Sequence, residues 1–254
     1  MARIDDLLDA ALKALPAKPA DDAPASIKKR YSEQVSNAVA PAFAEELRLR
    51  GLSSARPAPP GVVGLSGAER RMAGAIGAKK VDVTWATEES VDVTWATEES
   101  GLLLALSIKS INFRDGRTGN FQKNLTNRRD DLLYEAVTLH RRFPYAVLGG
   151  FVFLDRGAAS DDTGSRRSTF INADSRLRLF DGRNDPAGRD EQYERLYVVL
   201  LDANPFSPWW EAYRVGHPQE QIALEAALDD MITLVAERNP DFYEAEDGVL
   251  HSAR

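Results

Sequence analysis

Residues 91–110 read VDVTWATEESGLLLALSIKS, and this stretch decides the fold. Its first half alternates apolar with polar or small residues, which is the pattern of a strand with one buried side. A second strand-like run covers 102–109, and a turn over 98–101 makes the apolar faces of the two strands coincide. We therefore predict a β-hairpin with these opposing pairs: Val91 and Ile108, Asp92 and Ser107, Val93 and Leu106, Thr94 and Ala105, Trp95 and Leu104.

The sequence VDVTWATEES occurs twice without a change, as residues 81–90 and 91–100. Copies normally diverge, so this repeat is either a very recent duplication or a deliberate one. Because its length is even, either copy could pair with the following strand and keep every side chain on its own face. We expect the second copy to pair, because the first would insert a long loop into the hairpin. This choice decides whether Asp82 or Asp92 faces Ser107.

Helical and strand patterns surround the hairpin. Apolar residues at helical spacing predict helices over about 4–15, 26–47, 125–140 and 222–235. A capping box from Ser66 to Glu69 predicts another helix over 66–78, in which Glu69 could serve as the capping acid alone. In the helix over 26–47, Ser26 is a candidate cap, the stripe begins at Ile27, and Pro41 interrupts the pattern. A further short helix is predicted around 170–180.

Two nearly continuous apolar runs, 145–154 and 196–201, are typical of strands that are covered on both faces. The elements together predict an α/β fold with a central mixed sheet of four or five strands flanked by helices. We expect three parts: an N-terminal helical region with a Pro-rich linker over 1–60, an α/β core over 61–240 and a flexible tail over 241–254.

The composition limits the classes of function. The absence of cysteine excludes a disulfide framework and thiolate zinc sites, and the three histidines lack metal-ligand spacing. The first residues carry acids where a secretion signal needs a basic start, and no apolar stretch is long enough to span a bilayer. We therefore expect a cytoplasmic protein without membrane contact. The glycine patterns of nucleotide-binding loops are missing, so no nucleotide cofactor is expected.

The charge is distributed unevenly along the chain. The net charge is -7, but residues 101–189 carry 15 basic and 10 acidic side chains, against 17 and 29 in the rest. A basic centre of this kind is compatible with contact to phosphates, and a mixed solvated surface is the alternative.

Three polar residues share one face of the predicted hairpin: Asp92, Ser107 and Lys109. A carboxylate beside an ammonium suits metal-assisted phosphodiester hydrolysis, in which oxygen ligands hold Mg²⁺ and the lysine orients water or offsets charge. Two alternatives stay open. Asp92 could be a strand acid that simply pairs with Lys109, or Ser107 could be a nucleophile with Lys109 as its base.

The order of these features resembles the PD-(D/E)XK nuclease superfamily, which has the restriction endonuclease-like fold. The resemblance covers about 66–155 and rests on a helix, an Asp-bearing strand, a strand ending in x-x-Lys, and a helix with Asn and Arg near its start. It implies a restriction-type endonuclease that cuts double-stranded DNA with Mg²⁺, with Asp92 as a metal ligand and Lys109 as the motif lysine. Cutting two strands takes two sites, which implies a homodimer.

One position departs from that motif, because Ser107 stands where the second acid belongs. A hydroxyl is a weaker Mg²⁺ ligand than a carboxylate. The family is known to move this acid onto a neighbouring helix, which makes Glu69 the candidate, ahead of Glu98 and Glu99 in the turn. If no acid reaches the metal, the alternative is a catalytically silent DNA-binding or assembly module that keeps the fold.

Amide and guanidinium groups open the helix that follows the hairpin, where they suit phosphate and base-edge contacts. These residues are Gln122, Lys123, Asn124, Arg128 and Arg129. The alternative is a solvated face with local pairs to Asp130 and Asp131. A second basic set consists of Arg166, Arg167, Arg176, Arg178 and Arg183.

Overall fold

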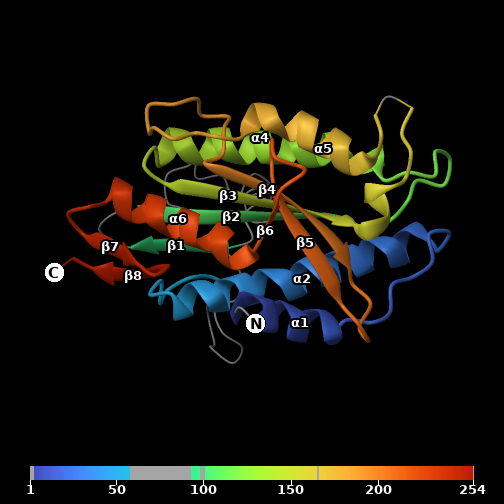
Figure 1. Ribbon diagram of the computed structural model, residues 1–254, viewed down its shortest axis with the longest axis horizontal. Coiled ribbons are helices and arrows are strands. Elements are labelled where there is room, and N and C mark those ends of the chain that lie inside the picture. Colours follow the sequence, from blue (N-terminus) through green and yellow to red (C-terminus); the bar gives the residue numbers. More distant parts are fainter. Residues whose placement is uncertain (1–2, 58–92, 98–100, 165, 254) are drawn as a thin grey trace, which may run out of the picture.

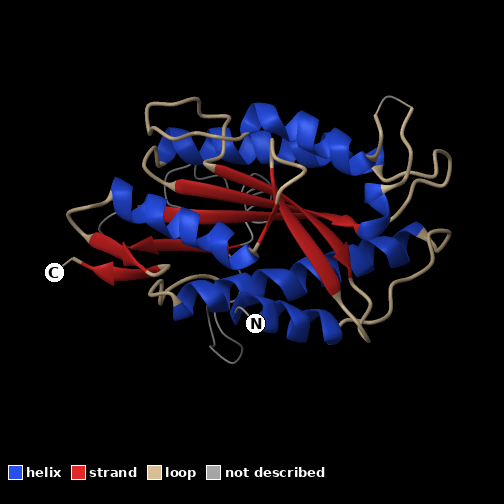
Figure 2. Cartoon of the chain, in the orientation of Figure 1, coloured by secondary structure: helices blue, strands red, loops and turns tan. Residues whose placement is uncertain are grey.

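The computed structural model describes residues 3–57, 93–97, 101–164 and 166–253. Within these ranges the chain forms a central mixed sheet between two layers of helices, which confirms the predicted α/β class (Figures 1 and 2). Several predictions concern residues outside these ranges: the helix over 66–78, the first copy of the repeat, Glu69, Asp82, Asp92, Glu98 and Glu99.

The central sheet has six strands in the spatial order β1-β2-β3-β4-β5-β6. The strands are β1 (Val93–Thr97), β2 (Gly101–Ile111), β3 (Val147–Asp155), β4 (Arg195–Asp202), β5 (Trp209–Arg214) and β6 (Gln221–Ile222). The three central strands β2, β3 and β4 are parallel, while β1, β5 and β6 add antiparallel pairs at the two sides. The sequence pattern predicted four or five strands, and it gave no sign of β5 and β6.

β1 and β2 form the predicted hairpin. Val93 lies opposite Leu106, and the predicted register holds as far as Trp95. The paired strand therefore comes from the second copy of the repeat, as expected. A bulge after Trp95 then shifts the register, so that Thr97 pairs with Gly101. Gly101 thus belongs to the strand and not to the turn, and its φ of 71° is a conformation that favours glycine.

Helices cover both faces of the sheet (Figure 1). One face carries α1 (Arg3–Lys13), α2 (Ala25–Leu49) and α6 (Leu224–Arg238), and the other carries α4 (Leu125–Arg142) and α5 (Thr169–Leu177). β2 and β3 are buried along almost their whole length because both of their faces are covered. None of the described helices combines the length and the apolar character that a membrane crossing needs.

α2 packs by the predicted stripe. Its buried side chains include Tyr31, Val35, Val39, Phe43 and Leu47, although Ile27 at its start is 49% exposed. Two predicted details are wrong. The helix continues through Pro41, and Ser26 does not cap it, because the carbonyl of Pro24 already accepts a helical hydrogen bond from the Lys28 N–H at 3.1 Å.

A second, two-stranded sheet replaces the flexible tail predicted for 241–254. It consists of β7 (Tyr243–Glu246) and β8 (Val249–Ser252), joined by an Asp-Gly turn with positive φ at both residues. Leu250 is buried, and its N–H donates a hydrogen bond of 2.8 Å to the carbonyl of Arg50 after α2. The tail prediction is wrong because these backbone and side-chain contacts fix the hairpin against α2.

Three short 3-10 helices complete the described elements: η1 (Gln122–Asn124), η2 (Arg156–Ala159) and η3 (Arg178–Phe180). We call the side of the sheet at which β2, β3 and β4 end the carboxyl edge. Asp161 ties two segments together there, because it accepts hydrogen bonds from the N–H groups of Phe121 at 2.9 Å and Thr169 at 2.7 Å. The starts of α4 and α5 therefore lie near each other at the carboxyl edge.

Candidate active site

The predicted lysine of β2 lies in a buried polar cluster. Ser107 and Lys109 point to the face of the sheet that α4 covers, and both are at most 5% exposed. The Lys109 Nζ lies 2.9 Å from Oε1 of Glu135, a residue of α4 that is itself buried. The structure therefore brings together two of the predicted site residues and adds an acid that the sequence did not single out.

Tyr193 is the fourth member of what we call the Lys109 cluster, which consists of Ser107, Lys109, Glu135 and Tyr193. The Tyr193 hydroxyl donates to Oε2 of Glu135 at 3.1 Å and lies 3.0 Å from the Ser107 Oγ. Ser107 also donates a hydrogen bond to Oε2 of Glu135. One carboxylate thus faces an ammonium and two hydroxyl groups, which is a neutral and well-bonded set.

Gly150 of β3 makes room for this arrangement. A Cβ atom at this position would lie 2.4 Å from Cδ2 of Leu196 and 3.5 Å from the ring of Tyr193. The bare backbone lets the tyrosine ring pass over β3 and reach Glu135. Gly150 is also the residue of β3 that pairs with Ser107 of β2.

The side-chain oxygen atoms of the cluster could serve as ligands of a hard cation such as Mg²⁺, which accepts carboxylate and hydroxyl oxygens. Glu135 is the one carboxylate in the cluster. Over the described ranges no group of three or more acids and histidines forms a ready-made metal site. The two predicted metal ligands, Asp92 and Glu69, lie outside those ranges.

Glu135 could have been identified from the sequence. It stands among Leu132, Ala136 and Leu139, which form the buried stripe of α4, so a charged residue occupies an apolar position of an amphipathic helix. Tyr193 left no comparable signal, because it precedes β4 in a loop without periodicity.

The predicted DNA-contacting residues lie together at the carboxyl edge, in η1 and the first turns of α4. Local pairs engage the charged ones, as the alternative interpretation expected. Arg128 contacts Asp131 at 3.2 Å and Arg129 contacts Asp130 at 2.7 Å. The Lys123 ammonium lies 2.9 Å from Asp115, and its hydrogen bond, together with backbone N–H groups, lowers the pKa of that carboxyl group to about 2.

The second basic set does not act as a unit. Arg166, Arg167 and Arg178 are exposed, and Arg176 donates to the Thr126 hydroxyl at 3.1 Å. Arg183 is fully buried, and its guanidinium lies 3.1 Å from Glu194. Arg183 therefore belongs neither to a phosphate-contacting surface nor to a solvated face, because a buried acid holds its side chain.

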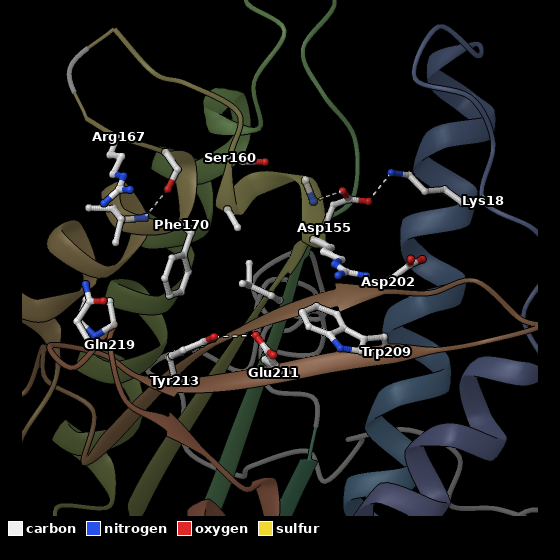
Figure 3. A pocket seen from close by; sticks show the side chains of 17 residues that line it. Lys18, Asp155, Ser160, Arg167, Phe170, Asp202, Trp209, Glu211, Tyr213 and Gln219 are labelled. Atoms are coloured by element: carbon white, nitrogen blue, oxygen red, sulfur yellow. Dashed lines mark hydrogen bonds and ion pairs between the residues drawn. The ribbon is translucent and has the colours of Figure 1, made fainter.

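A pocket of about 920 Å³ opens at the carboxyl edge between the ends of β3 and β4, the starts of α5 and β5, and the segment after α1 (Figure 3). Its aromatic lining consists of Phe170, Trp209 and Tyr213, and its charged lining of Lys18, Asp155, Arg156, Arg167, Asp202 and Glu211. The carboxyl ends of parallel strands are the usual place for a ligand site in open α/β sheets.

Hydrogen bonds and ring contacts order the lining of this pocket. Lys18 donates to Asp155 at 2.5 Å. Tyr213 donates to Glu211 at 2.7 Å, and burial, followed by this bond, raises the pKa of the tyrosine to about 12, so it remains a donor at neutral pH. The Arg156 guanidinium stacks 4.3 Å from the centre of the Trp209 ring.

Comparison of the chain with models of protein families, with curated proteins and with solved structures finds no match.

Proposed function

We propose that this protein is a Mg²⁺-dependent DNA endonuclease with a restriction endonuclease-like core, and that its active site contains Lys109 and Glu135. The observation that carries the proposal is the contact of 2.9 Å between the lysine at the motif position of β2 and a carboxylate on the following helix. Ser107 occupies the place of the second acid in that motif, and a glutamate from α4 compensates for its missing carboxylate.

In this proposal Glu135 and Asp92 hold the metal ion, and Glu69 is a further candidate ligand. The β-hairpin register supports the role of Asp92, because Val93 pairs with Leu106 as predicted, and the same predicted register would pair Asp92 with Ser107. When bound, Mg²⁺ neutralises charge on the phosphate and makes a coordinated water more acidic. Lys109 holds the attacking water or the developing phosphate charge, and Tyr193 and Ser107 keep Glu135 in position by their hydrogen bonds.

The basic side chains of η1 and α4 are proposed to contact the DNA backbone. Gln122, Lys123 and Asn124 lie at the carboxyl edge. Lys109 lies near the same end of β2, two residues before the strand ends at Ile111. The Lys109 cluster is buried, so access of DNA requires the residues that cover it to rearrange. Cutting both strands takes two such sites, and we propose that the protein acts as a homodimer in the cytoplasm.

The second candidate is a catalytically silent DNA-binding or assembly module. The same cluster favours it in one respect, because Lys109, Glu135, Ser107 and Tyr193 satisfy one another without a metal. The third possibility raised by the sequence, a Ser107 nucleophile with Lys109 as base, is disfavoured. An ammonium that forms an ion pair with Glu135 has no lone pair with which to accept the serine proton.

Cleavage of mixed plasmid and phage DNA with Mg²⁺ tests the proposal. We expect discrete fragments from the parent protein, and losses of at least about 100-fold in Lys109→Ala, Glu135→Gln and Asp92→Asn. Glu135→Gln keeps the shape of the side chain and an acceptor for Ser107 and Tyr193, but it removes the counter-charge of Lys109. Circular dichroism and urea denaturation are therefore measured beside cleavage, to show that the variant is folded under the assay conditions.

Asp82→Asn is the matched control, because Asp82 has the same ten-residue sequence context as Asp92. We expect this variant to cut like the parent protein. DNA that is bound but not cut by the parent would reject the endonuclease and support the silent module.

A further inference from the structure

The loop between β4 and β5 presents a large aromatic side chain to solvent. Phe206 lies at its tip and is 90% exposed, the largest value among the big apolar side chains of the described residues. Asn204 fixes the loop, because its side chain accepts from the Phe206 N–H at 3.0 Å and its carbonyl from the Ser207 N–H at 3.1 Å. Pro205 and Pro208 restrict the backbone further. The ring is therefore presented on a short, stiff loop.

The same loop borders the pocket. Asp202 and Trp209, which precede and follow it, are paired across β4 and β5, and both line the cavity (Figure 3). Phe206 is three residues from Trp209 and four from Asp202, so it lies within about 14 Å of each. A protruding apolar ring and a hollow of about 920 Å³ thus stand next to each other at the carboxyl edge.

The pocket combines flat aromatic surfaces with available cations. Phe170 and Arg167 lie on one side and Trp209 on the other (Figure 3). Neither Arg156 nor Arg167 has an ion-pair partner among the described residues, whereas the acids Asp155 and Glu211 are engaged by other side chains. Stacking on Trp209 holds the Arg156 guanidinium without using its N–H donors on a carboxylate. Aromatic faces beside unpaired guanidinium groups suit a ligand that carries both a flat ring and a phosphate.

Acceptor oxygens in the pocket add a preference for one kind of ring. Asp202 and Glu211 place carboxylates along the ends of β4 and β5 (Figure 3). A carboxylate accepts hydrogen bonds from the exocyclic amino groups of cytosine, adenine or guanine, which thymine lacks. The lining therefore favours a nucleotide with an amino-bearing base over one with thymine.

We propose that this pocket receives a nucleotide that is turned out of a DNA duplex, and that Phe206 enters the gap left in the base stack. The proposal rests on the DNA binding proposed above and extends it to a specific contact. An apolar wedge offsets part of the free energy of unstacking, and a snug aromatic pocket recovers more of it. The position of the pocket fits this role, because Asp161 links the start of α4, with its candidate DNA contacts, to the start of α5 in the pocket wall.

Duplexes with a single 2-aminopurine opposite an abasic site, and matched duplexes with a normal pair, provide the test. The full-length protein is added with Ca²⁺ in place of Mg²⁺, so that binding is measured by anisotropy and extrusion by 2-aminopurine fluorescence, both without cleavage. We expect the fluorescence to rise on binding. Phe206→Ala should abolish most of this rise and weaken binding, while Tyr145→Ala should leave both unchanged. Tyr145 is a matched control, because it is an exposed aromatic residue, 60% exposed, that precedes β3 at the opposite edge.

Free deoxynucleoside monophosphates, measured by equilibrium dialysis, test the pocket by itself. We expect weak, saturable binding of dCMP, dAMP or dGMP in preference to dTMP, and about tenfold weaker binding by Arg156→Gln. Binding of free nucleotides without any fluorescence rise in the duplex would overturn extrusion and leave a site for a free nucleotide. Absence of both signals would overturn the pocket as well.

The outcome for the nuclease is read separately. DNA that is bound and cut without a fluorescence rise rejects only the extrusion. A protein that binds no DNA at all rejects the extrusion and the proposed function together.

Discussion

Asp181 is a single carboxyl group that should make the stability of the protein depend on pH. Burial raises its pKa to about 6, although the Leu196 N–H donates to it at 2.6 Å and the charges of Arg214, Arg195 and His217 oppose the shift. Because the pKa in the folded state exceeds that in the unfolded state, the folded state binds more protons between pH 4 and 6, and its stability falls as the pH rises through this window.

Asp181→Asn keeps the acceptor for Leu196 and cannot ionise. We compare the free energy of unfolding of the variant with that of the parent at each pH. We expect the difference, variant minus parent, to be about 2 kcal/mol larger at pH 7 than at pH 4. Urea denaturation of both proteins at several pH values measures this difference. Parallel curves for the two proteins would contradict the assignment.

The individual residues of the candidate site are only partly predictable from the sequence. Lys109 and Ser107 were found because strand periodicity and a short motif place them on one face. Glu135 was not predicted, because apolar spacing marks the buried stripe of α4 as core and does not by itself give a role to the one charged residue within it. Tyr193 could not be found, because its contact depends on the path of a loop over Gly150.

A buried glutamate connects helices, strands and loops that are distant from one another in the sequence. Glu194, just before β4, lies 2.8 Å from Arg238 of α6 and 3.1 Å from Arg183, and it accepts a hydrogen bond of 2.7 Å from the Leu148 N–H of β3. Burial acts to raise its pKa, but the hydrogen bond from His140 and the nearby cations outweigh it, and the pKa is lowered.

Glu194→Gln leaves two buried guanidinium groups without their counter-charge. We expect it to lower the free energy of unfolding by about 3 kcal/mol, as measured by urea denaturation. Glu191→Gln is the control. Glu191 pairs with the exposed Arg189 at 2.5 Å, and loss of an exposed pair should change stability by less than about 1 kcal/mol. Equal effects of the two substitutions would show that the buried network does not stabilise the fold.

Elements differed in how well the sequence predicted them, for physical reasons. β2, β3 and β4 are long and buried on both faces, so their apolar runs are unambiguous. β5 and β6 are the last two strands on one side of the sheet, where partial exposure removes the apolar pattern, and β6 has only two residues. The hairpin of β7 and β8 carried an Asp-Gly turn signal, but its strands are too short and polar to have been read as strands.

For the whole molecule, the repeat permits a simple test of the architecture. Deleting 81–90 yields the same sequence as deleting 91–100, and the copy that remains offers β2 the same residues as Val93 and Trp95. We expect the shortened chain to keep the fold, with a free energy of unfolding within about 1 kcal/mol of the parent.

Urea denaturation and the DNA cleavage pattern measure the outcome of this deletion. Removal of both copies is the control, because it takes away β1 and uncovers the edge of β2, and we expect that chain to aggregate. A single-copy chain that also aggregates would show that the first copy is needed for the fold.

The hairpin of β7 and β8 also bears on how the protein is made. Its Leu250 donates to Arg50, so a contact that finishes the N-terminal helical layer joins residues 200 positions apart. During translation the end of α2 leaves the ribosome long before Leu250 has been synthesised, so this part of the helical layer stays incompletely covered until the chain has grown by these 200 residues. The nascent chain therefore depends on protection from aggregation throughout the interval between the synthesis of Arg50 and that of Leu250.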